Sequence, residues 1–218
     1  MMTVADKIDA KLVKDLREKS GAPMGDCLKA LQEAKGNIED AFVVLRKRCM
    51  ASAQKKAARS TNEGAVGTYI HAGGKIGVLI EVNCESDFVA RTEDFQDLLK
   101  DIAMHIAASD PRYIKPEDVT TEDLEREKEI YRAQEAATGK PAPVIEKIVD
   151  GKMAKFYEEV CLLEQPFIKE QTISIKELIA QKVGKLGENL TVRRFARFKV
   201  GAPDWTVSQT KAAEPASE

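Results

Sequence analysis

The chain has 218 residues, of which 43% are hydrophobic and 32% charged, a composition typical of a soluble globular protein of one to three small domains. Its formal net charge of -2 argues against a global field that would draw it onto nucleic acid. No apolar run approaches the roughly 18–20 residues of a membrane span, and residues 1–6 lack the basic start and apolar stretch of a secretory signal. The four cysteines show no C-x-x-C pairing, which argues against a metal site or disulfide framework and favours reduced thiols in the cytoplasm.

Residues 1–50 are expected to form a unit of three helices. Asp9 and Asn37 can cap the first and third helices, and Gly21 and Gly36 can end the first and second. None of these short helices is stable alone, so they must pack together. The apolar positions at helical spacing are Leu12, Val13, Leu16, Met24, Cys27, Leu28, Leu31, Ile38, Ala41, Phe42 and Leu45.

Residues 51–64 are expected to be a basic linker. The wider stretch 43–62 holds six cations and no acid, which is typical of a solvated connector. A basic arm for RNA is the alternative, but no aromatic residue is interleaved to stack on bases.

Residues 65–120 are expected to form the first part of an α+β core. Residues 65–70 and 76–82 read as antiparallel strands joined by a glycine-containing hairpin turn. The loop Asn83–Arg91 follows, and a helix capped by Thr92 comes after it. Phe88 in this loop must either tuck into the core or face a partner, and the residues alone leave both options open.

The rest of the chain is expected to contain a helical hairpin over 121–160 and the C-terminal part of the core over 161–200. Ser174 opens a capping box, and a strand follows over 190–200 with Leu190, Val192, Ala196, Phe198 and Val200 on one face. Residues 201–218 are rich in Pro, Ala, Ser and Glu and are expected to be a disordered tail, in which Trp205 has no assigned role.

Features of an enzyme are weak in this sequence. His105 lies at the margin of the apolar stripe of its helix, where a structural role is favoured on the residues alone. No nucleophile, acid pair or glycine-rich phosphate loop accompanies it, so we expect no catalytic residue, cofactor or metal. Two alternatives remain: a small α/β enzyme that uses His105 with a carboxylate, and an RNA-binding protein that uses the basic linker with Arg193, Arg194 and Arg197.

Several segments, in order along the chain, resemble the elongation factor Ts family. The run NCESDFVAR at 83–91 resembles the family signature, and LVKDLREKSGAPM at 12–24 resembles its ubiquitin-associated-like opening domain. Segments 105–119, 151–156 and 163–167 resemble its core and hairpin exit, so the resemblance covers roughly residues 4–200. Departures are small: Ser86 stands where the family usually has Thr, and Gly25 where some members have an apolar residue. A single core repeat indicates the short form of the family.

The resemblance implies a nucleotide exchange factor for translation elongation factor Tu. Such a factor binds the GDP-bound and nucleotide-free forms of elongation factor Tu, disturbs its Mg²⁺ site and promotes GDP release so that GTP can bind. The loop that the resemblance assigns to Mg²⁺ displacement contains Ser86, Asp87, Phe88 and Val89. The other partner contacts that it implies are Arg17, Met24, Lys56, Ile76, Gly77 and His105.

The single core repeat also leads us to expect a homodimer, because a one-hairpin sheet leaves strand 76–82 in need of a neighbour. The alternative is that residues 160–200 complete the sheet within one chain. We expect neither a membrane nor a nucleic acid as partner, and a cytoplasmic location, or the plastid stroma for an organellar source.

Overall fold

The computed structural model describes residues 8–137, 139–202 and 206–209. Its helices and antiparallel strands confirm the predicted α+β class. The chain divides into two compact units: unit 1 contains residues 1–64, 83–98 and 177–191, and unit 2 contains the remainder. The elements are α1 (Ala10–Ser20), α2 (Met24–Glu33), α3 (Ile38–Lys56), β1 (Glu63–Ile70), β2 (Ile76–Cys84), α4 (Asp87–Ala90), α5 (Glu93–Ser109), η2 (Pro116–Asp118), α6 (Thr121–Ala136), α7 (Ala142–Val160), η3 (Leu162–Glu164), β3 (Pro166–Phe167), β4 (Glu170–Ser174), α8 (Ile175–Leu186), β5 (Thr191–Lys199) and β6 (Thr206–Gln209).

The ends of the first helices lie where the capping residues predict them. Asp9 caps α1 by accepting a hydrogen bond from the Lys11 amide (2.9 Å), and the Asn37 side chain accepts bonds from two first-turn amides of α3. Gly21 ends α1 in the left-handed conformation, with a φ of 64°. These caps satisfy backbone groups that helix ends otherwise leave without partners.

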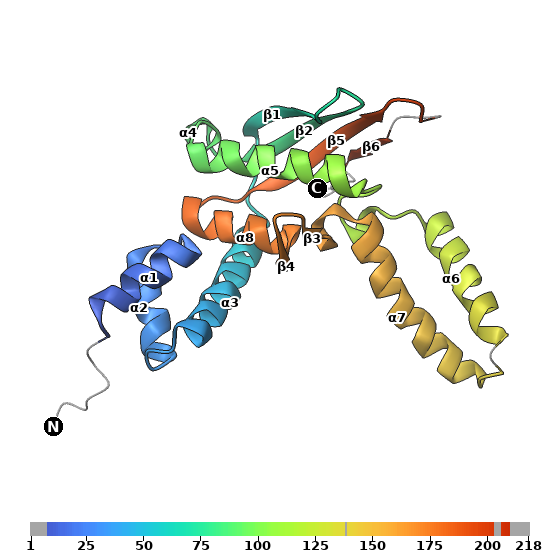
Figure 1. Cartoon of the computed structure of the whole chain (residues 1–218), viewed down its shortest axis with the longest axis horizontal. Coiled ribbons are helices and arrows are strands. Elements are labelled where there is room, and N and C mark those ends of the chain that lie inside the picture. The colour runs from blue at the N-terminus through green and yellow to red at the C-terminus, as the bar shows by residue number, and fades with distance from the viewer. Residues whose placement is uncertain (1–7, 138, 203–205, 210–218) are drawn as a thin grey trace, which may run out of the picture. The chain divides into compact units, whose positions relative to one another are not determined.

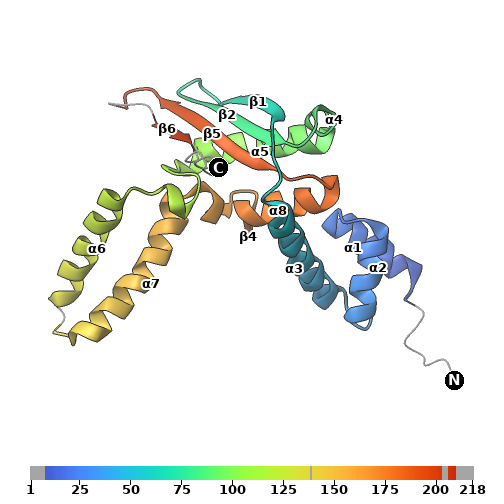
Figure 2. The same cartoon turned by 180° about the vertical axis from the view of Figure 1, so that it is seen from behind.

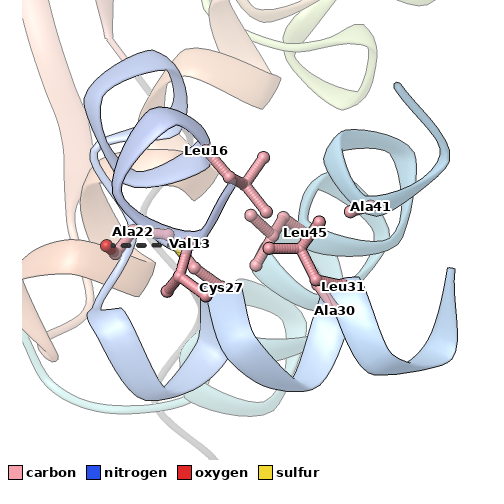
Figure 3. Close-up of a cluster of buried hydrophobic side chains, with 8 residues drawn as sticks. All are labelled: Val13, Leu16, Ala22, Cys27, Ala30, Leu31, Ala41 and Leu45. Carbon is pink, nitrogen blue, oxygen red and sulfur yellow. Dashed lines mark hydrogen bonds between the residues drawn. The ribbon is translucent and has the colours of Figure 1, made fainter. Parts of the chain in front are cut away.

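Helices α1, α2 and α3 share a small hydrophobic core. The contacts come from the predicted apolar stripes, and Leu16, Cys27 and Leu31 are each 0% exposed. Leu12, Ile38 and Phe42 are partly buried against this cluster. Figure 3 shows the eight buried residues, which are Val13, Leu16, Ala22, Cys27, Ala30, Leu31, Ala41 and Leu45.

The third helix is longer than the sequence pattern predicts. It continues to Lys56 and so takes in the first residues of the stretch 51–64 that was expected to be a linker. The middle and the end of α3 are bound to α8 within unit 1, where Arg46 binds Glu177 (2.5 Å) and the Lys56 ammonium donates to the Val183 carbonyl (3.3 Å). These bonds come from residues far apart in sequence, which is why local pattern gives no sign of them.

Unit 2 contains a four-stranded sheet with the order β1-β2-β5-β6. Gly73 and Gly74, with φ values of 88° and 67°, form the predicted hairpin turn between β1 and β2. Helix α5 lies along one face of this sheet in both views (Figures 1 and 2). Because β5 of the same chain lies beside β2, the argument for a homodimer from an unpaired β2 does not hold.

Strand β5 departs from the predicted assignment of its faces. Phe195 and Arg197 are 2% and 7% exposed, whereas Phe198 and Val200, which the pattern places on one face with the buried Val192, are 53% and 72% exposed. The buried Arg197 binds the end of α5, donating to the Ala107 carbonyl (3.2 Å) and pairing with Asp110 (3.0 Å). An arginine that satisfies a helix C-terminus therefore takes an inward position that hydrophobicity alone gives to an apolar residue.

The segment expected as a disordered tail contributes a strand. Residues 206–209 form β6, which pairs antiparallel with β5 in a register that places Ala196 opposite Val207. The prediction of disorder is therefore wrong for these four residues. Trp205 and residues 210–218 lie outside the described residues.

Two antiparallel helices occupy the stretch expected as a hairpin, with α6 and α7 side by side (Figure 1). Helix α7 buries Val149, Met153 and Phe156, whereas none of the residues of α6 is buried. At the base of the hairpin, the amides of Arg112 and Tyr113 both donate to the Val160 carbonyl (2.9 and 3.0 Å). Within the described ranges, no helix is both long and apolar enough to cross a membrane.

Candidate partner-binding site

The signature loop, residues 83–91, presents a phenylalanine to solvent. The loop leaves β2 at Cys84 and turns at once into the single-turn helix α4, whose N-cap Ser86 accepts a hydrogen bond from the Val89 amide (3.4 Å). Phe88, in that turn, is 79% exposed, while the nearby Ala90 is 7% exposed. The side chain is therefore not part of the core, which removes one of the two options that the sequence leaves open.

A carboxylate from a distant part of the chain holds the loop backbone. Glu188 accepts hydrogen bonds from the amides of Glu85 (3.1 Å) and Ser86 (3.0 Å), and from the Ser86 hydroxyl (2.6 Å). Bonds to a carboxylate are stronger than bonds between neutral groups. The backbone entering α4 is thus fixed, although the Phe88 side chain is free of such support.

Asp87, the acidic residue in α4, forms an ion pair within the signature loop. Asp87 pairs with Arg91 across one turn (2.8 Å), and both side chains are largely exposed. An exposed pair of this kind contributes at most about 1 kcal/mol, so it orients the Asp87 carboxylate without locking it. At the end of α4, the Gln96 side chain donates to the Ala90 carbonyl (2.7 Å), which ties the turn to α5.

Charges around the loop shift several pKa values. The pKa of Glu85 is lowered, chiefly by the hydrogen bond from the Asn189 amide and further by Arg59. The pKa of the Cys84 thiol is raised by burial and by the nearby Glu188 charge. These directions indicate an anionic Glu85 beside a neutral Cys84 thiol, an arrangement that suits structural support rather than nucleophilic chemistry.

Comparison with known proteins gives the family. The profile of the family described as Elongation factor TS matches residues 4–202. An Elongation factor Ts of Koribacter versatilis is 72% identical over 206 residues, which cover 94% of each chain. An Elongation factor Ts of Solibacter usitatus is 57% identical over 212 residues, covering 97% of this chain and 99% of the relative.

The chain belongs to the elongation factor Ts family. Membership associates it with translation elongation and protein biosynthesis. It also accounts for the order of motifs along the chain, from the opening helices through the signature loop to the hairpin exit.

The outlying residues that the elongation factor Ts resemblance selects are spread over both units. Arg17 and Met24 are exposed in the three-helix segment, Met24 to 46%. Lys56 is partly buried, with its ammonium already on the Val183 carbonyl. Ile76 and Gly77 are partly buried at the start of β2.

His105 is a core residue in this member of the elongation factor Ts family. It is 0% exposed, its Nε2 lies 2.9 Å from Gln165 Oε1, and its Nδ1 faces the Ile168 amide (3.4 Å). A side chain without exposed surface does not reach a partner in this conformation, so the implied contact through His105 does not fit the structure. Its polar neighbours are an amide side chain and a backbone amide, rather than the carboxylate that the enzyme alternative required.

The cations that suggested an RNA-binding alternative are largely engaged inside the protein. Arg46 binds Glu177, Arg48 binds Glu33, and Arg59 binds Glu85. Arg194 likewise binds Glu81 (2.6 Å) across the sheet. Side chains committed to carboxylates offer little positive field to a phosphate backbone.

Sequence reasoning missed the residues that support the loop, Glu188 and Asn189 above all. Their signal is slight: a Gly-Glu-Asn turn between a helix and a strand, at 187–189. Two polar residues in such a turn are ordinarily solvated, and only the fold brings them beside residues 85 and 86. Among the described residues, no group of three His, Cys, Asp or Glu side chains is arranged to hold a metal ion.

Proposed function

We propose that this chain is a guanine nucleotide exchange factor: it binds elongation factor Tu in its GDP-bound and nucleotide-free forms and promotes GDP release so that GTP can bind. The observation that carries this proposal is Phe88, a large apolar side chain 79% exposed on a loop whose backbone is fixed. Exposed apolar groups on ordered loops are typical of contact sites for other proteins. We propose that it acts in the cytoplasm, where translation takes place.

The mechanism that we propose needs no covalent chemistry, so the protein is not an enzyme in that sense. Phe88 enters between elements of the partner and holds them in a shifted arrangement, while the Asp87 carboxylate binds groups that the shift displaces. The Mg²⁺ that helps the partner to hold GDP then loses its geometry, which Mg²⁺ requires to be near-octahedral. Factor and nucleotide weaken each other's binding by the same factor, because the coupling is reciprocal.

Supporting contacts come from the exposed Arg17 and Met24 of the three-helix segment. Ser86 and Val89 lie in the same loop as Phe88, and we propose that they contact the partner together with it. The proposed contact residues also include Lys56, Ile76 and Gly77. His105 enters indirectly, by holding Gln165 and the backbone at Ile168.

A second copy of the chain is the other partner that we propose. Gly67 faces Leu99 of α5, so Val66 and Ile70 point to the opposite face of the sheet, where they are 62% and 66% exposed. Leu79 and Phe198 on the neighbouring strands are 46% and 53% exposed. An apolar sheet face of this kind can pack on its own symmetry mate, as the sheets of a sandwich do.

The test of the exchange function is Phe88→Ala. Loss of an aromatic anchor at an interface costs about 2–4 kcal/mol, so release of fluorescent GDP from elongation factor Tu should slow about 30-fold or more. Ile130→Ala is the matched control, because Ile130 is an apolar side chain 43% exposed on α6.

The melting temperature separates the outcomes of this test. The exposed Phe88 can be removed with little loss of stability, so the variant should melt within a few degrees of the parent. If Phe88→Ala promotes GDP release from elongation factor Tu as fast as the parent and the control do, the proposed insertion of Phe88 into the partner is wrong.

A further inference from the structure

The turn between α8 and β5 contributes the Glu188 side chain and the Asn189 backbone amide to the support of the signature loop. Gly187, with a φ of 81°, ends α8 by donating its amide to the Val183 carbonyl (3.0 Å). Glu188 then bridges the amides of Glu85 and Ser86 with one carboxylate oxygen and the Ser86 hydroxyl with the other. One side chain thereby satisfies both consecutive amides at the entrance of α4.

Asn189 ties the same loop to the segment that follows α3. It is 4% exposed, its amide donates to Glu85 Oε1 (2.6 Å), and its side chain donates to the Arg59 carbonyl (3.0 Å) and the Ala57 carbonyl (3.4 Å). Arg59 returns to Glu85 through an ion pair (3.4 Å). The loop and the end of the helical segment therefore share one support.

That support continues to the three-helix segment itself. Arg46 of α3 binds Glu177 of α8 through two hydrogen bonds (3.0 and 2.5 Å). Gly184 of α8 leaves room for Cys49, whose Sγ would lie 3.0 Å from an added Cβ. All of these residues belong to unit 1, together with the signature loop.

We propose that Glu188 and Asn189 are positioning residues, which hold the signature loop in a fixed orientation to the three-helix segment so that Phe88 is presented ready to insert. The inference rests on the proposed exchange function. Phe88 has almost no packing of its own, so its direction is set by the backbone of α4. A contact prepared before binding avoids the cost of ordering it at the interface, and a misplacement of about 1 Å is enough to lose much of its effect.

Hydrogen exchange of the free protein tests the hydrogen bonds from residues 188 and 189 to the signature loop, here called the clamp, in the absence of the partner. In Glu188→Ala, the amides of Glu85 and Ser86 should exchange about tenfold faster or more, the size expected for losing a hydrogen bond to a charged group. Glu188→Gln should stay close to the parent, because its Oε1 can accept both amides while its amide donates to the Ser86 hydroxyl. Glu158→Ala, which removes an exposed carboxylate from α7, is the control for lost charge.

Release of fluorescent GDP tests whether the clamp acts through Phe88. Glu188→Ala should slow release about tenfold in the parent background and should have little further effect in the Phe88→Ala background, because residues that act through one contact are not additive. With the conservative Glu188→Gln variant, elongation factor Tu should release GDP at a rate near that found with the parent. Asn189→Ala should act in the same direction, with the same dependence on Phe88.

Each result decides one point. The positioning role is overturned if the amides of Glu85 and Ser86 keep their protection in Glu188→Ala. It is also overturned if Glu188→Ala promotes GDP release as fast as the parent while Phe88→Ala slows that release. Should neither Phe88→Ala nor Glu188→Ala slow release, although the amides exchange faster, the exchange function of the loop fails and the clamp survives as a structural feature. If Glu188→Ala does not fold, Glu188→Asp, one methylene shorter and still charged, takes its place with the same expected results.

Discussion

Two phenylalanines near the signature loop have opposite environments. Phe95, in the first turn of α5, is 0% exposed, whereas Phe88 is 79% exposed. Leaving such a side chain in water forgoes about 1.5–3 kcal/mol of burial, so its exposure lowers the stability of the free protein. The loss is understandable where the side chain becomes buried against another molecule.

Hydrogen bonds around His105 determine its protonation. The Gln165 side-chain amide donates to the Glu159 carbonyl (2.7 Å), so its oxygen faces His105 and must accept a proton from Nε2. Nδ1 is then an acceptor, as the Ile168 amide requires. The histidine is therefore neutral in the folded protein, and its pKa lies below the ordinary 6.5, chiefly because of burial.

Acid should destabilise the protein partly through this histidine. As pH falls below 6.5, the unfolded chain takes up a proton at His105 and the folded chain does not, so the free energy of unfolding decreases toward the folded-state pKa. The slope from this group is at most about 1.4 kcal/mol per pH unit. Urea unfolding at several pH values between 5 and 7 should show a shallower decrease for His105→Gln than for the parent.

The control for this pH dependence is the other histidine of the chain. His71 is exposed at the hairpin turn, so His71→Gln removes an imidazole outside the core and serves as the control for the substitution itself. Equal slopes for the parent and His105→Gln would show that His105 titrates alike in both states.

At the scale of elements, the opening helices and the hairpin are stabilised differently. Helices α1 to α3 share a cluster of buried side chains contributed by residues 13–45. In the hairpin, the buried cluster lies on α7 and the segments next to it, and α6 adds only the partly buried Leu124 and Tyr131, with ion pairs to α7 such as Arg132 with Glu146 (2.8 Å). Three helices that each bury residues in one cluster form the more independent of the two arrangements.

A fragment of residues 8–57 should therefore fold on its own. Its core is complete within the segment, although domains of this size are marginal and the fragment loses the bonds from α3 to α8. Circular dichroism should show helical content and a cooperative thermal transition. Leu16→Ala, which removes a fully buried side chain worth about 2–5 kcal/mol, should abolish that transition. A parent fragment that melts without cooperativity would mean that α8 is required.

The sequence predicts those parts of this fold that are governed by neighbours along the chain. Asp9, Asn37 and Gly21 give helix ends correctly, because caps act within one turn. The length of α3 and the role of Glu188 could not be predicted, because their partners lie more than 100 residues away. In the candidate site, the residues of the loop were predicted and their support was not.

For the molecule as a whole, the exposed sheet face is the feature that bears on assembly. Gly77, whose added Cβ would lie 3.1 Å from Ile70 Cδ1, shares the outer face with Leu79. Arg194 pairs with Glu81 on the same face and lies four residues before Phe198. An apolar strip with one charged pair at its side suits a symmetric contact, in which the strip of one copy covers that of the other.

Sedimentation at micromolar concentration should find the parent at twice the chain mass of 24.1 kDa. Leu79→Lys should shift it to the monomer, because burying an unpaired charge in an apolar contact is costly, whereas Val144→Lys on α7, at a side chain 44% exposed, should leave the dimer intact. Val144→Lys should keep the parent's melting temperature, whereas Leu79→Lys should stay folded and lose only the stabilisation that dimer formation gives, since both positions are exposed in the single chain. If the parent sediments near 24.1 kDa and still promotes GDP release from elongation factor Tu at the full rate, one copy is sufficient for exchange. The exposed sheet face would then serve another purpose.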